Sequence, residues 1–223
     1  MRQSRVLAGI GAISFGVLTF AGFLLASAPG STYKASDVAD YLASGHRVAV
    51  IAGMYLGWLG VLGLICLLAH LRGYLGDVAG KGMAASMFWG AGIAAATSFA
   101  LGWSVDGGQI IAHIEGGKDF TVSPQVTHLI SEVGSVLFIF GSGSALLGFA
   151  LIALMLGSRG TLPGWLRWMT LVGGVCGIAG PAFFTFLLVL VWSIVVGGWL
   201  LLAGRASSAG PAFPSGDEGQ LTR

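Results

Sequence analysis

Four ionisable side chains in the middle of the chain have the types that proton transfer or metal binding requires: Asp106, His113, His128 and Glu132. Imidazole and carboxylate groups exchange protons at moderate pH, and together they suit a divalent metal ion. His128 and Glu132 are four residues apart, so they share one face of a helix, which Ser135 continues. On the topology derived below, all four groups lie at the outer face of a membrane protein and could converge at one mouth.

The spacing of these four residues limits which kind of site the sequence predicts. Only His128 and Glu132 have the helical spacing of metal ligands, and no H-E-x-x-H pattern occurs, so we predict neither a metal site nor a cofactor. Glu132 is expected a few residues below the membrane interface, where an ionisable group is by default a candidate functional residue. Two interpretations stay open: a local structural pair with His128, or a role in proton transfer, metal binding or substrate binding.

Other motifs that imply a known chemistry are incomplete. Residues 76–82 (G-D-V-A-G-K-G) approach a phosphate-binding loop, but three residues separate the glycines where four are needed, and glycine follows the lysine. Cys66 and Cys176 both lie in apolar blocks without a neighbouring histidine, which indicates free thiols. No nucleophile with a histidine and a nucleophile-elbow glycine pattern occurs.

The composition indicates a protein of the lipid bilayer. Charged residues make up 9% of the 223 residues and hydrophobic residues 55%, with a mean hydropathy of +0.87, whereas about a quarter of a soluble domain is charged. The net charge of +2 is small, and the basic residues lie between apolar blocks, so we expect no nucleic-acid partner.

The apolar blocks predict an all-α fold, a polytopic six-helix transmembrane bundle, because a membrane core of about 30 Å requires about 20 apolar residues in a helix. The predicted spans are residues 6–27, 48–71, 82–105, 128–156, 162–180 and 182–203. The last two divide one charge-free stretch, which Gly180-Pro181 should break, because proline cannot donate to the helix ladder. Residues 206–223 are rich in glycine, serine and proline and predict a disordered cytoplasmic tail.

The basic residues orient this bundle. With six helices and a cytoplasmic N-terminus, eight of the eleven lysines and arginines fall on the inner side, as the positive-inside rule requires. We therefore predict a multi-pass membrane protein with both termini in the cytoplasm. Arginine outnumbers lysine eight to three and the chain has 38 glycines, which fits a GC-rich bacterial genome and hence a bacterial plasma membrane. Trp103 is expected among the interfacial aromatic residues of the outer boundary.

Short elements are predicted between the spans on the outer side. Ser36 can cap one helix that runs to Ser44, and residues 108–115 can form another. Ser123-Pro124 predicts the start of the fourth span, with serine as the cap and proline at the first helical position.

Small residues predict where the helices pack, because close backbone approach replaces the hydrophobic effect in lipid. The candidates are Gly53, Gly57 and Gly60 in the second span and Gly173 and Gly177 in the fifth. These faces serve either packing within the bundle or contact with a second copy or a membrane-protein partner.

Two segments carry a resemblance to a known kind of protein. L-P-G-W-L-R-W at residues 162–168, followed by a glycine-rich helix, a Gly-Pro break and V-W-S-I-V-V at residues 191–196, resembles the closing helix pair of a family of uncharacterised bacterial six-helix integral membrane proteins, a domain of unknown function. The resemblance implies a fold and a plasma-membrane location, and it assigns no catalytic residue.

Three functions are compatible with these features. The first is a non-enzymatic accessory or interaction subunit, because polar groups within the spans are few and no catalytic constellation is complete. The second is a small transporter or channel-like protein that uses the outer cluster for proton or cation coupling. The third is a membrane enzyme that acts on a lipid or quinone at the same mouth.

Overall fold

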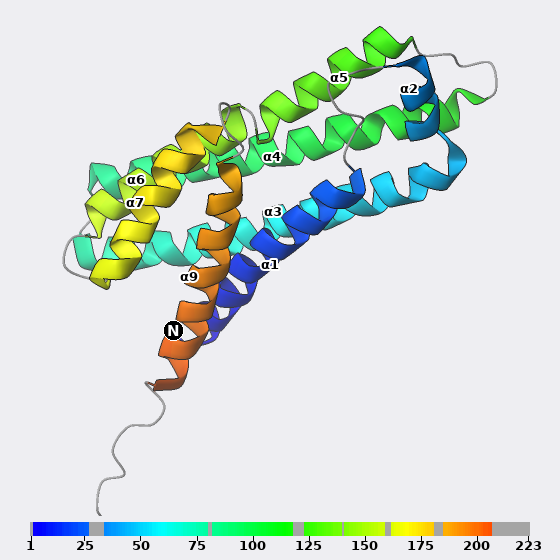
Figure 1. Ribbon diagram of the computed structural model, residues 1–223. Coiled ribbons are helices and arrows are strands. Elements are labelled where there is room, and N and C mark those ends of the chain that lie inside the picture. Colours follow the sequence, from blue (N-terminus) through cyan, green and yellow to red (C-terminus); the bar gives the residue numbers. More distant parts are fainter. Residues whose placement is uncertain are drawn as a thin grey trace, which may run out of the picture.

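The computed structural model describes residues 2–26, 34–79, 82–117, 123–139, 141–158, 162–180 and 185–206. All regular secondary structure in these segments is α-helical, so the predicted all-α class is confirmed (Figure 1). Five segments are long and apolar enough to cross a membrane: Gln3–Ala26, Gly45–Leu75, Met83–Glu115, Pro124–Gly157 and Phe186–Ala203. The chain therefore has the architecture of a multi-pass membrane protein.

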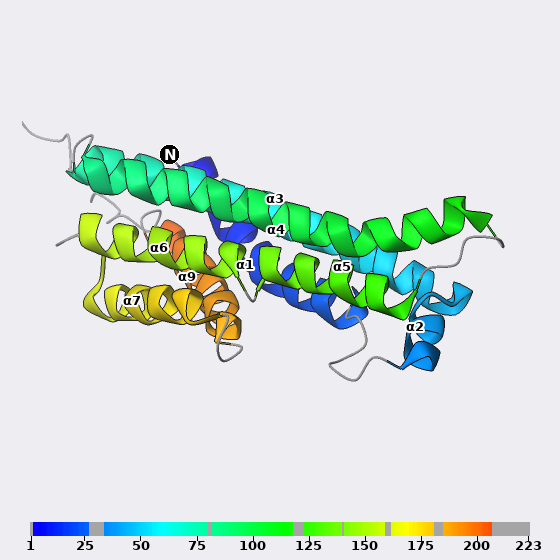
Figure 2. The same cartoon turned by 90° about the horizontal axis from the view of Figure 1, so that it is seen from above.

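Six helices form a closed ring. They are α1 (Arg2–Ala26), α3 (Ser44–Ala79), α4 (Met83–Glu115), α6 (Ser142–Gly157), α7 (Gly164–Ile178) and α9 (Phe186–Ala206). In this order each helix packs on the next, and α9 packs back on α1 (Figures 1 and 2). Arg5, Arg72 and Arg167 lie towards one end of the ring, which we call the arginine end.

The predicted count of six spans is wrong, because α7 is too short. Its 15 residues extend about 22 Å, against a membrane core of about 30 Å. The predicted break after residue 180 is present, since α7 ends at Ile178 and α9 begins at Phe186; Pro181 lies outside the described residues. The end of this segment is packed inside the protein, where a Cβ on Gly180 would lie 3.0 Å from the carbonyl oxygen of Ile139.

The predicted fourth span is divided into α5 (Pro124–Leu137) and α6. Phe138 and Gly141 have non-helical backbone angles, although neither a proline nor a charge marks the break. Ser98 of α4 replaces a helix hydrogen bond at the break, because its hydroxyl donates to the carbonyl oxygen of Leu137 at 2.7 Å. The same hydroxyl lies 2.6 Å from the Ser142 hydroxyl. The start of α5 is as predicted, with the Ser123 side chain accepting a hydrogen bond from the Val126 amide at 3.3 Å.

Two helices extend well beyond the predicted spans. α3 has 36 residues and α4 has 33, which corresponds to about 54 Å and about 50 Å. The separate short helix predicted at residues 108–115 is wrong, because α4 continues through Gly107, which packs against the Met54 thioether of α3. The other short helix, α2 (Ala35–Tyr41), is present, but Lys34 and not Ser36 is its cap residue.

The extended ends carry the remaining elements. α5 packs on α4 and on α2, and α2 also contacts α3. We call this assembly the headpiece: α2, α5, residues 44–52 of α3 and residues 107–115 of α4. It lies at the far end from the arginine end (Figures 1 and 2). α1 stops short of the headpiece, since its last residue, Ala26, packs on Gly53.

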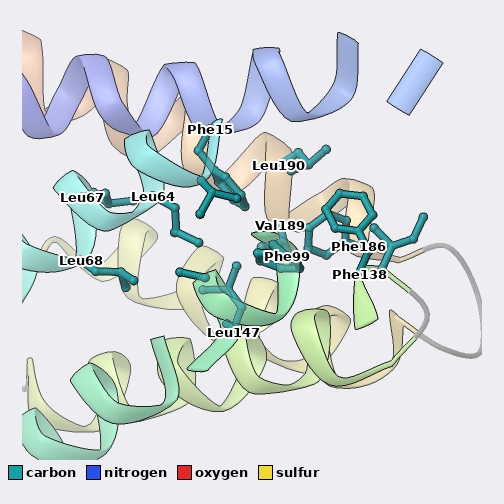
Figure 3. Close-up of a cluster of buried hydrophobic side chains, with 14 of the residues drawn as sticks. Phe15, Leu64, Leu67, Leu68, Phe99, Phe138, Leu147, Phe186, Val189 and Leu190 are labelled. Carbon is teal, nitrogen blue, oxygen red and sulfur yellow. The ribbon is translucent and has the colours of Figure 1, made fainter. Parts of the chain in front are cut away.

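An aromatic cluster fills the centre of the ring (Figure 3). The Phe99 ring lies 5.9 Å from Phe15, 5.3 Å from Phe138 and 5.4 Å from Phe186, measured between ring centroids. These residues come from α1, α4, the α5–α6 break and the start of α9, so one cluster joins four parts of the fold. Leu64 and the other labelled leucines surround it.

The predicted packing glycines of α3 lie at contacts within this chain. A Cβ on Gly53 would lie 2.8 Å from the side chain of the last residue of α1, and one on Gly60 would lie 2.6 Å from the Thr19 hydroxyl. A Cβ on Gly57 would overlap the indole of Trp103. These close approaches allow α1 and α4 to reach the α3 backbone.

The predicted glycines of α7 lie at similar contacts. A Cβ on Gly177 would lie 2.9 Å from the Gly148 Cα of α6, and one on Gly173 would lie 3.4 Å from the Trp192 side chain of α9. All five glycines thus serve contacts between helices of the same chain.

Candidate functional site

The contact between α4 and α5 is the polar part of the headpiece. A Cβ on Gly134 of α5 would lie 2.6 Å from the Asp106 Oδ1 atom of α4, so the absence of a side chain there leaves room for the carboxylate. One turn further along α4, the Gln109 amide donates a hydrogen bond to the Ser131 hydroxyl at 3.1 Å. The two helices therefore meet through polar and small residues.

Asp106 lines a small cavity of about 50 Å³ where the headpiece meets the ring. The other lining residues are Phe23, Ala26, Trp103, Ser135, Phe138 and Ile139. A water molecule needs at least about 10–15 Å³ of such space, whereas pockets for organic ligands have about 300–1,000 Å³. The cavity suits a few water molecules and is too small for an organic substrate.

Trp103 also lines this cavity. Its side chain is only 2% exposed, and its indole N–H is buried without a hydrogen-bond acceptor in the described part of the chain. The prediction that Trp103 is an interfacial residue is wrong, because it covers Gly57 inside the bundle. Trp103 is buried because α3 and α4 approach each other closely here, and the sequence alone does not reveal this contact.

His128 and Glu132 form the predicted pair on α5. The His128 Nδ1 atom lies 3.8 Å from Glu132 Oε1, and the two side chains are 40% and 60% exposed. Neither residue lines the cavity that contains Asp106. The pair is therefore a separate feature on the surface of the headpiece.

His113 lies in the last turn of α4, two turns beyond Asp106. The described segments contain no group of three or more His, Cys, Asp or Glu side chains that could hold a metal ion. Of the four residues singled out in the sequence, His113, His128 and Glu132 thus lie in the headpiece, and the structure brings only His128 and Glu132 into a pair. Asp106 lies at the boundary with the ring and lines the cavity there.

Replacing Glu132 by glutamine should change the free energy of unfolding by less than about 0.5 kcal/mol, because exposed pairs four residues apart contribute about that much at most. Chemical unfolding of the purified protein in detergent, at low and at high salt, measures this change. Glu115→Gln, an exposed carboxylate at the end of α4, is the matched control. A loss of several kcal/mol in the Glu132 variant alone would contradict a simple surface pair.

Comparison with known proteins adds no further information on this site. Searches against protein-family models, curated proteins and solved structures found no match. The resemblance of residues 162–168 and 191–196 to a family of uncharacterised bacterial membrane proteins therefore stays a prediction, and the function has to be inferred from the geometry alone.

Proposed function

We propose that this chain is a non-enzymatic accessory or interaction subunit of a bacterial plasma membrane, with both termini in the cytoplasm. Although α7 is shorter than a membrane core, α1 and α9 run antiparallel, because Gly9 packs on Leu201 and Gly16 on Leu190, so the start of α1 and the end of α9 lie at the same end of the ring. The observation that carries the proposal is the filled interior of the ring. Phe15, Phe99 and Trp192 are among its largest fully buried side chains, together with several leucines. A channel or transporter needs a polar path, and this packing leaves little space for one.

Three of the buried hydroxyl groups do not contribute to such a path, because helix carbonyl groups already accept their hydrogen bonds. Ser98 donates to the Leu137 carbonyl, Thr170 to the Leu166 carbonyl and Ser193 to the Leu190 carbonyl. Hydroxyl groups engaged in this way stabilise helices and are not available to coordinate a moving ion. The filled interior therefore favours the subunit over the transporter.

The enzyme alternative receives little support from the cavity at Asp106. Its volume of about 50 Å³ is far below the roughly 300 Å³ that the smaller ligand pockets occupy. A lipid or quinone headgroup would have to displace Trp103 or Phe138, both of which are buried.

An exposed apolar face on the headpiece supports an interaction role. Val126, Leu129, Val133 and Val136 lie on the outward face of α5 and are 47–65% exposed, whereas Thr127 faces inward. α4 is about 20 Å longer than a membrane core of about 30 Å, so part of the headpiece extends beyond the lipid. An apolar face at that height fits the extracytoplasmic surface of a membrane-protein partner.

The distribution of charge supports the orientation. Arg5, Arg72 and Arg167 lie towards the arginine end, and Asp37 and Glu132 lie in the headpiece, as do Asp40 and Glu115. The positive-inside rule places the arginine end in the cytoplasm and the headpiece outside.

Photo-cross-linking in native membranes tests the proposal. A photoreactive residue at Leu129 should give one discrete protein adduct, and the same residue at Leu188, an exposed position on α9 within the ring, should give none. The adduct should disappear when Val133 is replaced by glutamate and should persist in the Asp106→Asn and Glu132→Gln variants, because the proposal assigns these carboxylates no chemistry.

Three results would overturn the proposal. Adducts with lipid only would show that α5 faces the bilayer, and adducts of the chain with itself only would show a homo-oligomer. Transport or turnover by the reconstituted protein that Asp106→Asn abolishes would establish one of the other two functions.

A further inference from the structure

A second pocket lies near the arginine end, between α6 and α7. Its volume is about 230 Å³, and it is lined by Met155, Gly164, Arg167, Trp168 and Leu171. The lining combines one guanidinium group with apolar side chains. It is more than four times larger than the cavity at Asp106 and belongs to a different part of the fold.

Arg167 provides the cationic side chain among the described residues that line this pocket. Its Nε atom is buried and has no hydrogen-bond partner in the described part of the chain. A buried charged donor is costly unless an acceptor is nearby, and no described carboxylate forms an ion pair with it. The acceptor that fits a guanidinium fork best is a phosphate or carboxylate group, through two parallel hydrogen bonds.

The direction of α7 indicates which kind of molecule carries the phosphate or carboxylate group. The helix begins beside the pocket at Gly164 and runs into the ring, and Trp168, Val172 and Val175 form an exposed apolar face along it, 70%, 51% and 53% exposed. This face is in line with the pocket because its residues are spaced three and four apart. An anionic headgroup at Arg167 thus has an apolar track for an acyl chain beside it.

We propose that this pocket binds the phosphate of an anionic phospholipid from the membrane leaflet at the arginine end. Arg167 holds the phosphate, Trp168 lies at the interface, and one acyl chain follows Val172 and Val175 along α7. Basic pockets between membrane helices are suited to such headgroups. The site is independent of the proposed partner at the headpiece.

Lipid titration followed by native mass spectrometry tests this site on the full-length protein in detergent. The unaltered protein should bind phosphatidylglycerol about tenfold more tightly than phosphatidylcholine, because both carry the phosphate but only phosphatidylcholine adds a cationic trimethylammonium group, which Arg167 repels. Arg167→Gln should abolish this preference. Arg72→Gln removes a charge from the same end of the bundle, where the guanidinium stacks 4.7 Å from the Trp89 ring, and should keep the preference.

A second variant separates the pocket from its charge. An added side chain at Gly164 meets open space, with no atom within 4 Å of the Cβ position, so Gly164→Leu should fold normally and fill the pocket. It should weaken binding of phosphatidylglycerol about as strongly as Arg167→Gln does, although every arginine remains. Far-UV circular dichroism and thermal melting check that each variant is folded.

Three outcomes would overturn the inference. Equal losses in Arg72→Gln and Arg167→Gln would show a general charge effect, and normal binding by Gly164→Leu would place the lipid elsewhere. Competition by glycerol 3-phosphate at concentrations similar to those of phosphatidylglycerol would indicate a soluble phosphate ligand instead of a lipid.

Discussion

Replacing Phe99 by alanine is expected to lower the free energy of unfolding by about 3–5 kcal/mol, the range for removing a fully buried phenylalanine. Phe99 is 0% exposed, and its ring contacts Phe15, Phe138 and Phe186. These neighbours belong to α1, to the break between α5 and α6 and to α9, and these three parts cannot all move into the space together. The cavity should therefore persist, and its cost should lie towards the upper part of this range.

Unfolding in mixed micelles, followed by circular dichroism, measures this effect. Phe149→Ala is the matched control, because Phe149 lies on α6 with 52% of its surface exposed and should lose under about 1 kcal/mol. The Phe99 variant should also be cleaved faster by protease between α5 and α6, where Phe138 loses one of its ring contacts. Equal effects of the two substitutions would show that the aromatic cluster does not hold the fold together.

Replacing Gly63 by alanine is expected to destabilise the protein by about 1–3 kcal/mol, the usual cost of overpacking. Gly63 of α3 faces Gly11 of α1, and an added Cβ would overlap the Gly11 carbonyl oxygen. A Cβ on Gly11 would in turn lie 2.6 Å from the Gly63 carbonyl oxygen. Backbone atoms cannot rotate away, so α1 and α3 would have to separate over their whole contact.

Gly90→Ala is the control for this prediction. It lies within α4, and an added Cβ there has no neighbour within 4 Å. Because alanine favours a helix over glycine by up to about 1 kcal/mol, this substitution should leave stability unchanged or raise it. Gly63→Ala should therefore lower stability whereas Gly90→Ala should not, and a gain of stability at both positions would indicate that helix propensity, and not the α1–α3 contact, controls the result.

Features that depend only on residues close together in the sequence could be predicted from the sequence. A long charge-free block has few alternatives to a membrane helix, so the all-α membrane architecture follows from composition. The start of α5 at Ser123-Pro124 depends only on the cap and on the fixed backbone angle of proline. The His128–Glu132 pair depends only on the helical repeat.

The break between α5 and α6 could not be predicted from the sequence. No residue in the segment forbids a continuous helix, and the hydroxyl that satisfies the free carbonyl of Leu137 comes from Ser98, 39 positions earlier. The end of α7 is partly a local feature, because Gly180-Pro181 follows it in the sequence, but the packing of Gly180 against Ile139 and Ser144 involves residues far away in the sequence. Such positions depend on distant partners, which periodicity does not reveal.

The same distinction applies to the candidate sites. Residue types drew attention to Asp106, His113, His128 and Glu132, but the α4–α5 contact decides that Asp106 shares a cavity with Trp103 and not with the histidines. From the sequence, Arg167 is only one of the basic residues that orient the chain. The packing of α7 on α6 buries its Nε atom and places the side chain at a pocket, and the sequence alone does not reveal this. Helix type and membrane character arise from interactions between near neighbours in sequence, whereas pockets and partners arise where helices meet, and those contacts exist only in the folded chain.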